Sequence, residues 1–259
     1  MRQASARPRP GFSLIELIVV LAITATLAGL LFPVMARARE RVNRVMSANN
    51  LRMLGLGFTQ YDADTNGRLP ESKLLAQGGS PADLTRLYDS TFIVDQFGVQ
   101  TTGWDGLGLL FGLGYVSMPD VFYAPNHVGL AEFERYGDSF WDPGAQKIYG
   151  SYHYGGDMDW ETGARRTVNS ANLVLASEGF RSLSGLTHRD GLNLLHGDGS
   201  VRWFHLDTTF LAQLTLPGES PAEVADRYRP LWRAIEGGNG FGVGDIGGGP
   251  NGFGQPGLP

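Results

Sequence analysis

The sequence predicts an α+β fold: a long N-terminal α-helix, membrane-spanning in its first half, packed on a globular head with an antiparallel β-sheet. Two observations predict it. Residues 17–32 form an uncharged apolar run, close to the roughly 20 residues that a helix needs to cross a bilayer. Farther along, four short segments rich in β-branched and aromatic residues are separated by turn residues, a pattern typical of antiparallel strands.

The composition limits the class of protein. The chain has 259 residues, of which 42% are hydrophobic, and this supports one sizeable core or two small ones. With 26 acidic and 21 basic residues the net charge is −5, which argues against a nucleic-acid-binding protein, because such proteins carry a basic face. The sequence has no cysteine, so disulfides, thiolate zinc sites and cysteine nucleophiles are excluded.

The apolar run has three interpretations. A cleaved secretory signal peptide has a shorter apolar core, about 7–15 residues, before a small-x-small cleavage site, and residues 36–38 (Ala-Arg-Ala) fit such a site. An ordinary membrane anchor accounts for the length, but it leaves Glu16 near hydrocarbon, where an acidic residue costs about 2.5–3.5 kcal/mol. The third interpretation supplies a cation for this carboxylate.

That interpretation rests on residues 11–18, which read Gly-Phe-Ser-Leu-Ile-Glu-Leu-Ile and follow a leader containing Arg2, Arg7 and Arg9. The segment combines a basic leader, a glycine, an aromatic residue, a glutamate four positions later and an uninterrupted apolar run. It resembles the type III signal of type IV pilin-like proteins, a family that includes type IV pilins and the pseudopilins of type II secretion systems.

The resemblance implies a processing site and an assembly site. A prepilin peptidase would cut after Gly11 on the cytoplasmic side, and the new amino group of Phe12 would be N-methylated. Glu16 would pair with the Phe12 amine of a neighbouring subunit, because opposite charges at low dielectric offset each other's loss of hydration. Pro33 stands where many pilins carry a helix-loosening proline, so a helix break is expected there.

The long helix is expected to cover residues 12–61, with residues 12–32 in the membrane or the filament core. Beyond the apolar run, hydrophobic residues recur every three or four positions, whereas Arg37, Arg41 and Arg44 lie on other faces, as in an amphipathic helix. These arginines form a solvated face, or they contact anionic lipid or the acidic head of a neighbouring subunit.

Residues 62–67 (Asp-Ala-Asp-Thr-Asn-Gly) are expected to end this helix, because they combine helix-breaking and turn-forming residues. Asp62, Asp64 and Asn66 are also spaced like the start of a calcium-binding EF-hand loop, but Lys73 stands where that loop needs its closing glutamate. The segment is therefore a capping turn or a calcium site, and no other cofactor is expected.

The head is expected to span residues 62–236. Strands are predicted at residues 148–154, 173–177, 192–196 and 201–206, and Asp198-Gly199 is predicted to join the last two as a two-residue hairpin turn. Residues 237–259 are mostly glycine, asparagine and proline, and they should form a disordered tail because they have too few apolar residues to order themselves.

A second motif lies near the C-terminal end of the head. His188 precedes Asp198-Gly199 by nine intervening residues, and Asn193 lies between them. This pattern resembles the His-x9-Asp-Gly signature of a large group with a pilin-type N-terminus, formerly a domain of unknown function. We expect His188 and Asp198 to tie a loop to the hairpin through hydrogen bonds. Catalysis by Ser200, His188 and Asp198 is not expected, because the sequence has no nucleophile elbow.

The sequence therefore predicts a structural protein and not an enzyme. Its leader is residues 1–11, and its precursor crosses the inner membrane once, with the head outside the cytoplasm. Prepilin peptidase, an inner-membrane assembly platform and identical or related subunits are the expected partners. The expected product is a type IV pilus-like filament or a type II secretion pseudopilus, in the periplasm or at the cell surface. The alternative is a membrane-anchored periplasmic binding or adhesion module that does not polymerise.

Overall fold

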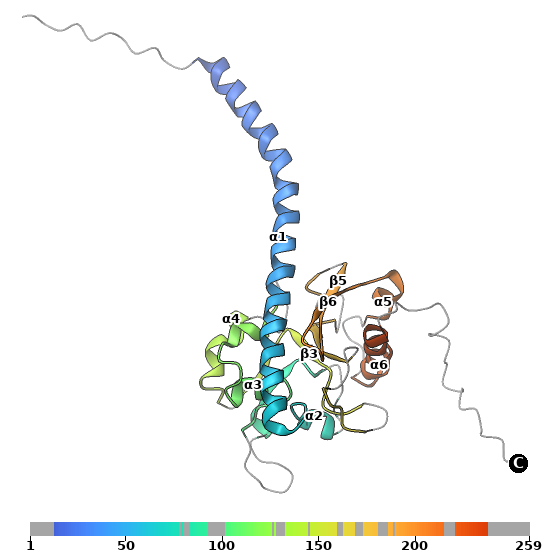
Figure 1. The fold of residues 1–259 in the computed structure, drawn as a ribbon. Helices are drawn as coiled ribbons and strands as arrows, with labels where there is room; N and C mark the ends of the chain where they lie inside the picture. Colours follow the sequence, from blue (N-terminus) through green and yellow to red (C-terminus); the bar gives the residue numbers. More distant parts are fainter. Residues whose placement is uncertain are drawn as a thin grey trace, which may run out of the picture. The chain divides into compact units, whose positions relative to one another are not determined.

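The computed structural model forms two compact units, Met1–Val42 and Asn43–Pro259. The structure describes residues 13–77, 79, 83–92, 102–125, 127, 133–144, 146–159, 163–168, 173–180, 186–188, 190–214 and 221–237. The predicted leader, residues 1–11, lies outside these ranges, and so does the predicted tail apart from Gly237. Helix α1, Leu14–Thr65, begins in the first unit and ends in the second (Figure 1).

In the first unit, α1 is apolar and exposed. An 18-residue window of the helix has a mean hydropathy of 2.5, and none of it is buried within the protein. Leu14 and Ile15 are each 73% exposed. Within the described residues, α1 is the one helix long and apolar enough to span a bilayer, so its composition fits the predicted membrane-spanning segment.

The helix break predicted at Pro33 is wrong, because α1 continues through this residue. Proline lacks a backbone N–H, so its presence removes one hydrogen bond to the carbonyl four residues earlier. That residue is Gly29. Helices of the membrane-spanning type tolerate a single proline when the neighbouring bonds of the ladder are kept.

In the second unit, one face of α1 is buried. The buried positions recur every three or four residues and consist of Asn43, Ser47, Ala48, Leu51, Leu54, Gly55, Gly57 and Phe58. Two glycines allow this face to approach the head closely. A Cβ at Gly55 would lie 3.0 Å from Leu195 Cδ1, and one at Gly57 would lie 2.7 Å from Val116 Cγ2. Their cost in helix propensity is therefore offset by close packing.

The main sheet of the head has four antiparallel strands in the order β3-β4-β5-β6. These are β3 (Tyr152–Tyr154), β4 (Val174–Glu178), β5 (Gly191–His196) and β6 (Val201–His205). A second, two-stranded antiparallel sheet pairs β1 (Arg86–Asp89) with β2 (Lys147–Tyr149). The α+β class and its antiparallel sheet are thus confirmed.

The single strand predicted at residues 148–154 is two strands in two sheets. Gly150 and Ser151 separate β2 from β3, and their N–H groups donate to the carbonyls of Thr85 and Phe122. The backbone therefore leaves one ladder before it joins the other. The aromatic and β-branched composition predicted the extended conformation, but it carries no information about which strand each half pairs with.

The β5–β6 hairpin also differs from the predicted two-residue turn. Leu195 pairs with Val201, and the Gly199 N–H donates to the His196 carbonyl at 2.9 Å. Gly199 has a φ of 77°, which forms a three-residue loop with a bulged glycine. A two-residue turn at Asp198-Gly199 would pair His196 with Val201, so the observed register differs from the predicted one by one residue.

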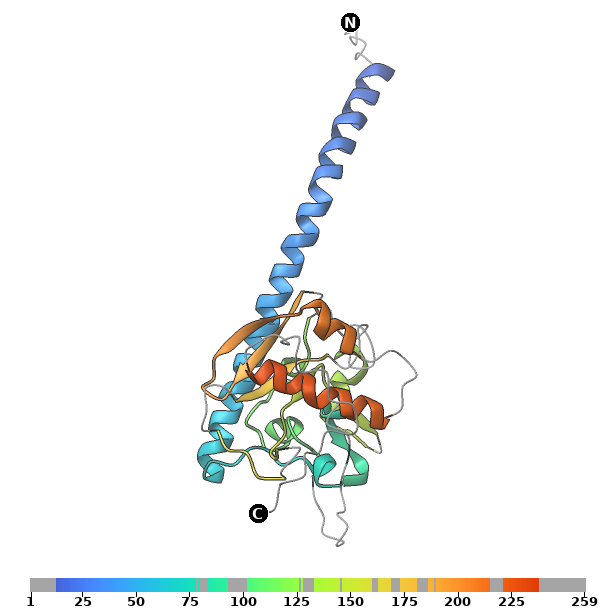
Figure 2. The same cartoon turned by 90° about the vertical axis from the view of Figure 1, so that its right-hand side faces the viewer.

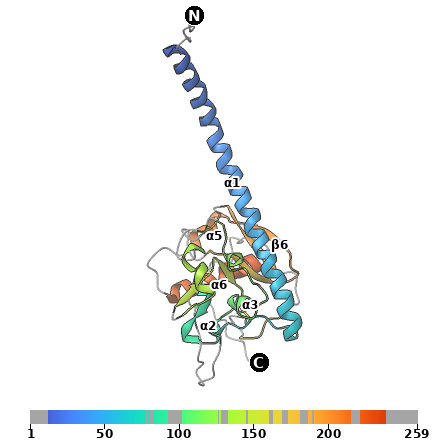
Figure 3. The ribbon, with the colours of Figure 1, turned by 90° about the vertical axis from the view of Figure 1, so that its left-hand side faces the viewer.

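The four-stranded sheet lies between two helical layers. One hydrophobic cluster contains Leu51, Leu54 and Phe58 of α1 together with Tyr152, Tyr154, Leu175 and Leu195 of the sheet. The other contains Val174, Leu192, Leu194 and Phe204 of the sheet together with Phe210, Tyr228, Leu231 and Trp232. Views from opposite sides show α6 over one face (Figure 2) and the second part of α1 over the other (Figure 3).

Short elements complete the head. Between α1 and β2 the chain forms α2 (Lys73–Ala76), η2 (Ser90–Phe92), α3 (Gly108–Gly112), η3 (Pro119–Phe122), α4 (Phe133–Tyr136) and η4 (Gly137–Phe140). After β6 come α5 (Thr208–Gln213) and α6 (Pro221–Gly237). Asp207 caps α5 by accepting the Phe210 N–H at 2.7 Å, as expected for a helix starting after this residue.

Candidate functional site

The processing segment begins at residues that the structure does not describe, Gly11 and Phe12. The first described residues form a capping box on α1. The Ser13 N–H donates to Glu16 Oε2 at 2.9 Å, and the Glu16 N–H donates to Ser13 Oγ at 3.2 Å. In this motif a serine and a glutamate three residues later satisfy each other's backbone donors at a helix start.

The capping box gives Glu16 a role within a single chain. A carboxylate in the first turn of a helix also meets the positive end of the helix dipole. These contacts also account for Glu16 in an ordinary membrane anchor. The Ser-x-x-Glu spacing of Ser13 and Glu16 was the sequence signal for this cap. Pairing of Glu16 with an amine of another subunit remains a prediction.

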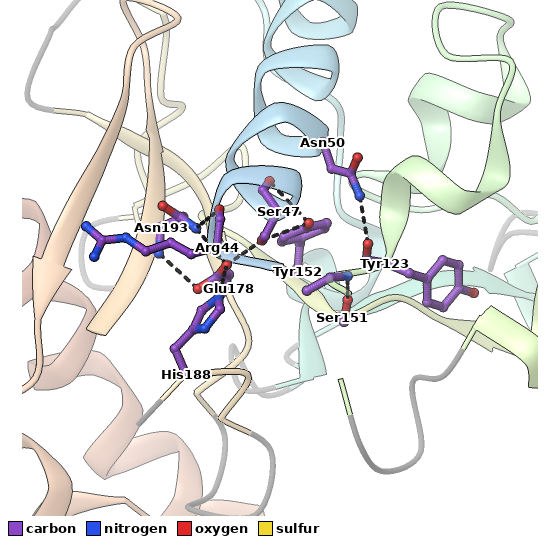
Figure 4. A network of polar contacts seen from close by, with 10 residues as sticks. Arg44, Ser47, Asn50, Tyr123, Ser151, Tyr152, Glu178, His188 and Asn193 are labelled. Atoms are coloured by element: carbon purple, nitrogen blue, oxygen red, sulfur yellow. Dashed lines mark hydrogen bonds and ion pairs between the residues drawn. The ribbon is translucent and has the colours of Figure 1, made fainter. Parts of the chain in front are cut away.

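The second candidate site is a buried polar cluster between α1 and the sheet, which we call the Glu178 cluster. It comprises Arg44, Ser47, Tyr152, Glu178, His188 and Asn193, drawn in Figure 4. Glu178, at the end of β4, is fully buried. Its Oε1 accepts a hydrogen bond from Ser47 Oγ of α1, and Ser47 Oγ lies 3.0 Å from the Tyr152 hydroxyl of β3. The cluster thereby joins the helix to two strands.

Asn193 of β5 makes the largest number of the described contacts with Glu178. Its backbone N–H donates to Oε2 at 3.0 Å, and its Nδ2 donates to Oε1 at 2.9 Å. The same amide donates to the Arg44 carbonyl of α1 at 3.1 Å. Asn193 therefore connects the sheet both to the carboxylate and to the helix backbone.

His188 contacts both this cluster and β6 of the hairpin, where its ring packs edge-on against Trp203 with the centroids 5.5 Å apart. Its Nε2 lies 3.4 Å from Glu178 Oε1, and both side chains are almost completely buried. Asp198 makes separate contacts: its Oδ1 accepts from the Ser200 N–H and hydroxyl, and its Oδ2 pairs with Arg202 at 3.0 Å. The described contacts of Asp198 therefore lie within the hairpin, and the tie of His188 and Asp198 through hydrogen bonds remains a prediction.

The surroundings of the cluster suit structural anchoring. Burial raises the pKa of the Tyr152 hydroxyl above its ordinary value of 10.0, so this group stays protonated and able to donate. Beside the cluster, the Arg44 guanidinium stacks on the Trp203 ring, 3.4 Å from its centroid, and this covers the sheet edge with a cation–π contact. A buried, mutually hydrogen-bonded group of this kind fixes how helix and sheet fit together.

The possible calcium residues do not surround a common point. Asp62 and Asp64 both lie in the last turns of α1, and side chains two apart on a helix do not face each other. Asp64 Oδ2 accepts the Tyr115 hydroxyl at 3.0 Å. Asn66 has a φ of 57°, and the Gly67 N–H donates to the Asp62 carbonyl at 3.0 Å, which forms a helix C-cap. Among the described residues, no group of three acidic or histidine side chains could hold a metal ion.

Sequence reasoning found His188 and Asn193 but missed Ser47, Tyr152 and Glu178. Ser47 is 131 residues from Glu178 and 105 from Tyr152, so no local spacing connects them. A weaker signal did exist. Ser47 falls on the apolar stripe of α1, and Glu178 ends a strand that is buried at every position, and polar groups at such positions require partners.

Comparison with known proteins bears on the processing segment. Residues 7–32 match the family described as the prokaryotic N-terminal methylation motif. No curated protein and no solved structure matches the chain. The match covers Gly11, Phe12 and Glu16, and it ends before the Glu178 cluster and the His-x9-Asp-Gly pattern, which it leaves untested.

The chain thus has a type IV pilin-like N-terminus. The motif implies a prepilin-like protein that is processed by prepilin peptidase, and together with the exposed apolar part of α1 it indicates a precursor in the inner membrane. Proteins of the pilin-like type are typically structural and not enzymes. The Glu178 cluster agrees with this class, because its described hydrogen bonds join elements of the fold.

Proposed function

We propose that the chain is a structural subunit of a helical filament, either a type IV pilus-like fibre or a type II secretion pseudopilus. The peptidase cuts after Gly11, Phe12 is N-methylated, and the precursor waits in the inner membrane with its head outside the cytoplasm. An assembly platform then builds identical or related subunits into the filament. We assign residues 12–61 to the filament helix, 62–236 to the head and 237–259 to a disordered tail.

One observation carries this proposal: the methylation motif at residues 7–32 opens a helix whose apolar surface is unburied within the chain. Exposed apolar surface of this extent requires lipid or other protein around it. A membrane satisfies this requirement in the precursor, and neighbouring copies of α1 satisfy it in a filament. The anchored head supports the same function, because the Glu178 cluster fixes the head on the helix part that begins at Asn43.

Mass spectrometry of the mature chain from its own cells tests the processing step. We expect methyl-Phe12 as the first residue. The matched control is Gly11→Leu, which places a bulky side chain at the cleavage position and should leave the leader attached. A mature chain that starts at Met1, or near Arg39 as a secretory signal peptide would, contradicts the proposal.

The capping box favours a second candidate, a membrane-anchored periplasmic binding or adhesion module that does not polymerise. In that protein Glu16 would serve only the start of α1. Glu16→Gln separates the two functions, because glutamine still completes a capping box but removes the charge. Processed, membrane-bound Glu16→Gln protein that forms no filaments supports the subunit. If Glu16→Gln forms filaments in the native amount, Glu16 has no role in assembly. If neither the variant nor the unaltered protein forms filaments, the anchored module is supported.

A further inference from the structure

The head carries an exposed tryptophan on a rigid aromatic base. Trp141 is 71% exposed, and its ring packs edge-on against Phe111 with the centroids 5.4 Å apart. Phe111 in turn contacts buried Phe140 at 4.9 Å and Trp104 at 5.1 Å. An indole that is held in place from behind and open in front loses little entropy on binding, which is typical of residues that dominate an interface.

The surroundings of Trp141 are acidic. Asp138 and Asp142 flank it in the chain, and both are exposed. Among the described residues from 102 to 147, the exposed charged side chains are four acidic ones, Asp120, Glu134, Asp138 and Asp142, and two basic ones, Arg135 and Lys147. We call Phe111, Asp138, Trp141 and Asp142 the acidic tryptophan patch. Its chemistry fits a cationic, planar partner such as arginine, which stacks on indole and pairs with carboxylates.

The chain itself carries such a partner. Arg37, Arg39 and Arg41 are exposed on α1 beyond the apolar run, and we call them the arginine belt. Arg37 and Arg41 share one face of the helix, where like charges four residues apart repel each other. Acidic groups placed beside them would reduce this repulsion. The next arginine, Arg44, already stacks on Trp203 of its own head, so this chemistry occurs within the molecule.

We propose that the acidic tryptophan patch of one copy receives the arginine belt of a second copy. The inference rests on the proposed filament and names the surfaces that meet in it. Because the patch and the belt are different surfaces of the same chain, the contact is head-to-tail, and contacts of this type generate open helical assemblies. Opposite charges set which surfaces meet and in which register, and Trp141 supplies the apolar anchor.

The absence of cysteine from the chain allows a direct test by cross-linking. Full-length protein carrying both Arg41→Cys and Asp142→Cys should give a ladder of disulfide-linked multimers when assemblies from its own cells are oxidised. The matched control replaces Asp142→Cys by Asp190→Cys, an exposed aspartate that precedes β5, and should give no ladder. A ladder of equal strength from both pairs, or polymer without a ladder from the first pair, overturns the inference.

A charge exchange provides the second measurement. Asp138→Arg with Asp142→Arg should lower the amount of sedimentable polymer at least about tenfold, because like charges then face each other. Adding Arg37→Asp and Arg41→Asp should restore polymer if the two surfaces meet. Failure to restore it overturns the contact.

Melting temperatures of the variants exclude unfolding as the cause of lost polymer. Electron microscopy of the unaltered protein separates this inference from the proposed function. Filaments without the predicted cross-link leave the function standing and remove only this contact. An unaltered chain that forms no filament removes both.

Discussion

Two glutamates make hydrogen bonds with α1, one exposed to solvent and the other buried in the head. Glu16 caps the first turn of the helix, accepts the Ser13 N–H at 2.9 Å and is exposed. Glu178 contacts the middle of the helix through Ser47 and is fully buried. Both carboxylates accept hydrogen bonds from a backbone N–H, but only Glu178 has its whole environment supplied by its own chain.

The difference between the two glutamates shows which part of α1 has its packing partners within the chain. From Asn43 onward, the head supplies apolar and polar partners for α1, so this part is ordered by its own packing. Before Asn43, α1 exposes its side chains, and the partners of this segment must come from lipid or from other subunits. Changes in the head should therefore alter the stability of the folded chain, whereas changes at the start of α1 should alter assembly more than stability.

The largest expected effect on stability is that of Glu178→Ala. The substitution leaves the Ser47 and Asn193 donors buried without their acceptor and removes the carboxylate beside His188. Loss of one member of such a group costs about 3–5 kcal/mol. Thermal unfolding of the full-length protein in detergent, followed by tryptophan fluorescence, measures the change. The matched control is Asp198→Asn at the exposed hairpin turn, which should leave the stability almost unchanged because exposed ion pairs contribute little. Equal losses from both variants would show that the cluster does not anchor the head.

The second prediction concerns a buried carboxylate of the head, Asp105. Burial raises its pKa from 3.8 to about 6, although the Lys73 N–H and the charge of Arg86 act in the opposite direction. The folded protein therefore binds this proton more tightly than the unfolded chain does. The stability that this contributes is present below pH 4 and is lost as the pH rises to about 6, by about 1–3 kcal/mol.

Asp105→Asn tests this dependence, because asparagine keeps an acceptor for the Lys73 N–H and does not ionise. The variant should show a smaller fall in unfolding free energy between pH 4 and pH 6.5 than the unaltered protein, and Asp157, whose pKa is also raised by burial, should account for part of the remainder. Denaturant titrations at these two pH values, read by tryptophan fluorescence, provide the comparison. Asp120→Asn, at an exposed position, is the control and should keep the slope. A slope in Asp105→Asn as steep as that of the unaltered protein assigns the pH dependence to other groups.

The third prediction applies one substitution to both parts of α1. A Cβ at Gly57 would lie 2.7 Å from Val116, so Gly57→Ala should destabilise the head by about 1–2 kcal/mol despite the better helix propensity of alanine. At Gly29 a Cβ meets nothing within 4 Å, so Gly29→Ala should stabilise the helix by about 0.5–1 kcal/mol. Circular dichroism melts of the two variants should shift in opposite directions. A shift of the same sign would remove the distinction between the two parts.

The sequence predicted those features that depend on local pattern. The apolar run, the helix end at residues 62–67 and strands at the positions of β4, β5 and β6 all follow from composition and spacing. β1 was missed because Arg86–Asp89 is short and carries charge at both ends. The split of residues 148–154 between two sheets depends on partners elsewhere in the chain, which a local pattern does not contain.

The same distinction explains the candidate site. His188 and Asn193 were found through their resemblance to a signature, but Ser47 and Glu178 were not, because 131 residues separate these two and no local pattern connects them. The cap at Glu16 was missed although its signal is local: Ser13 and Glu16 have the Ser-x-x-Glu spacing of a capping box. This spacing is only four residues long and is therefore weak evidence by itself.

The smallest expected effect on stability comes from Ser13→Ala. It removes the acceptor for the Glu16 N–H but keeps the glutamate charge, so the start of α1 should lose about 0.5–1 kcal/mol. Hydrogen exchange of the first-turn amides in detergent should increase several-fold, while the melting temperature of the head stays unchanged. Filaments should still form, because the charge that assembly requires is present. The opposite result is that Ser13→Ala forms no filaments while Glu16→Gln still does. That result would show that assembly depends on the cap and not on the charge of Glu16.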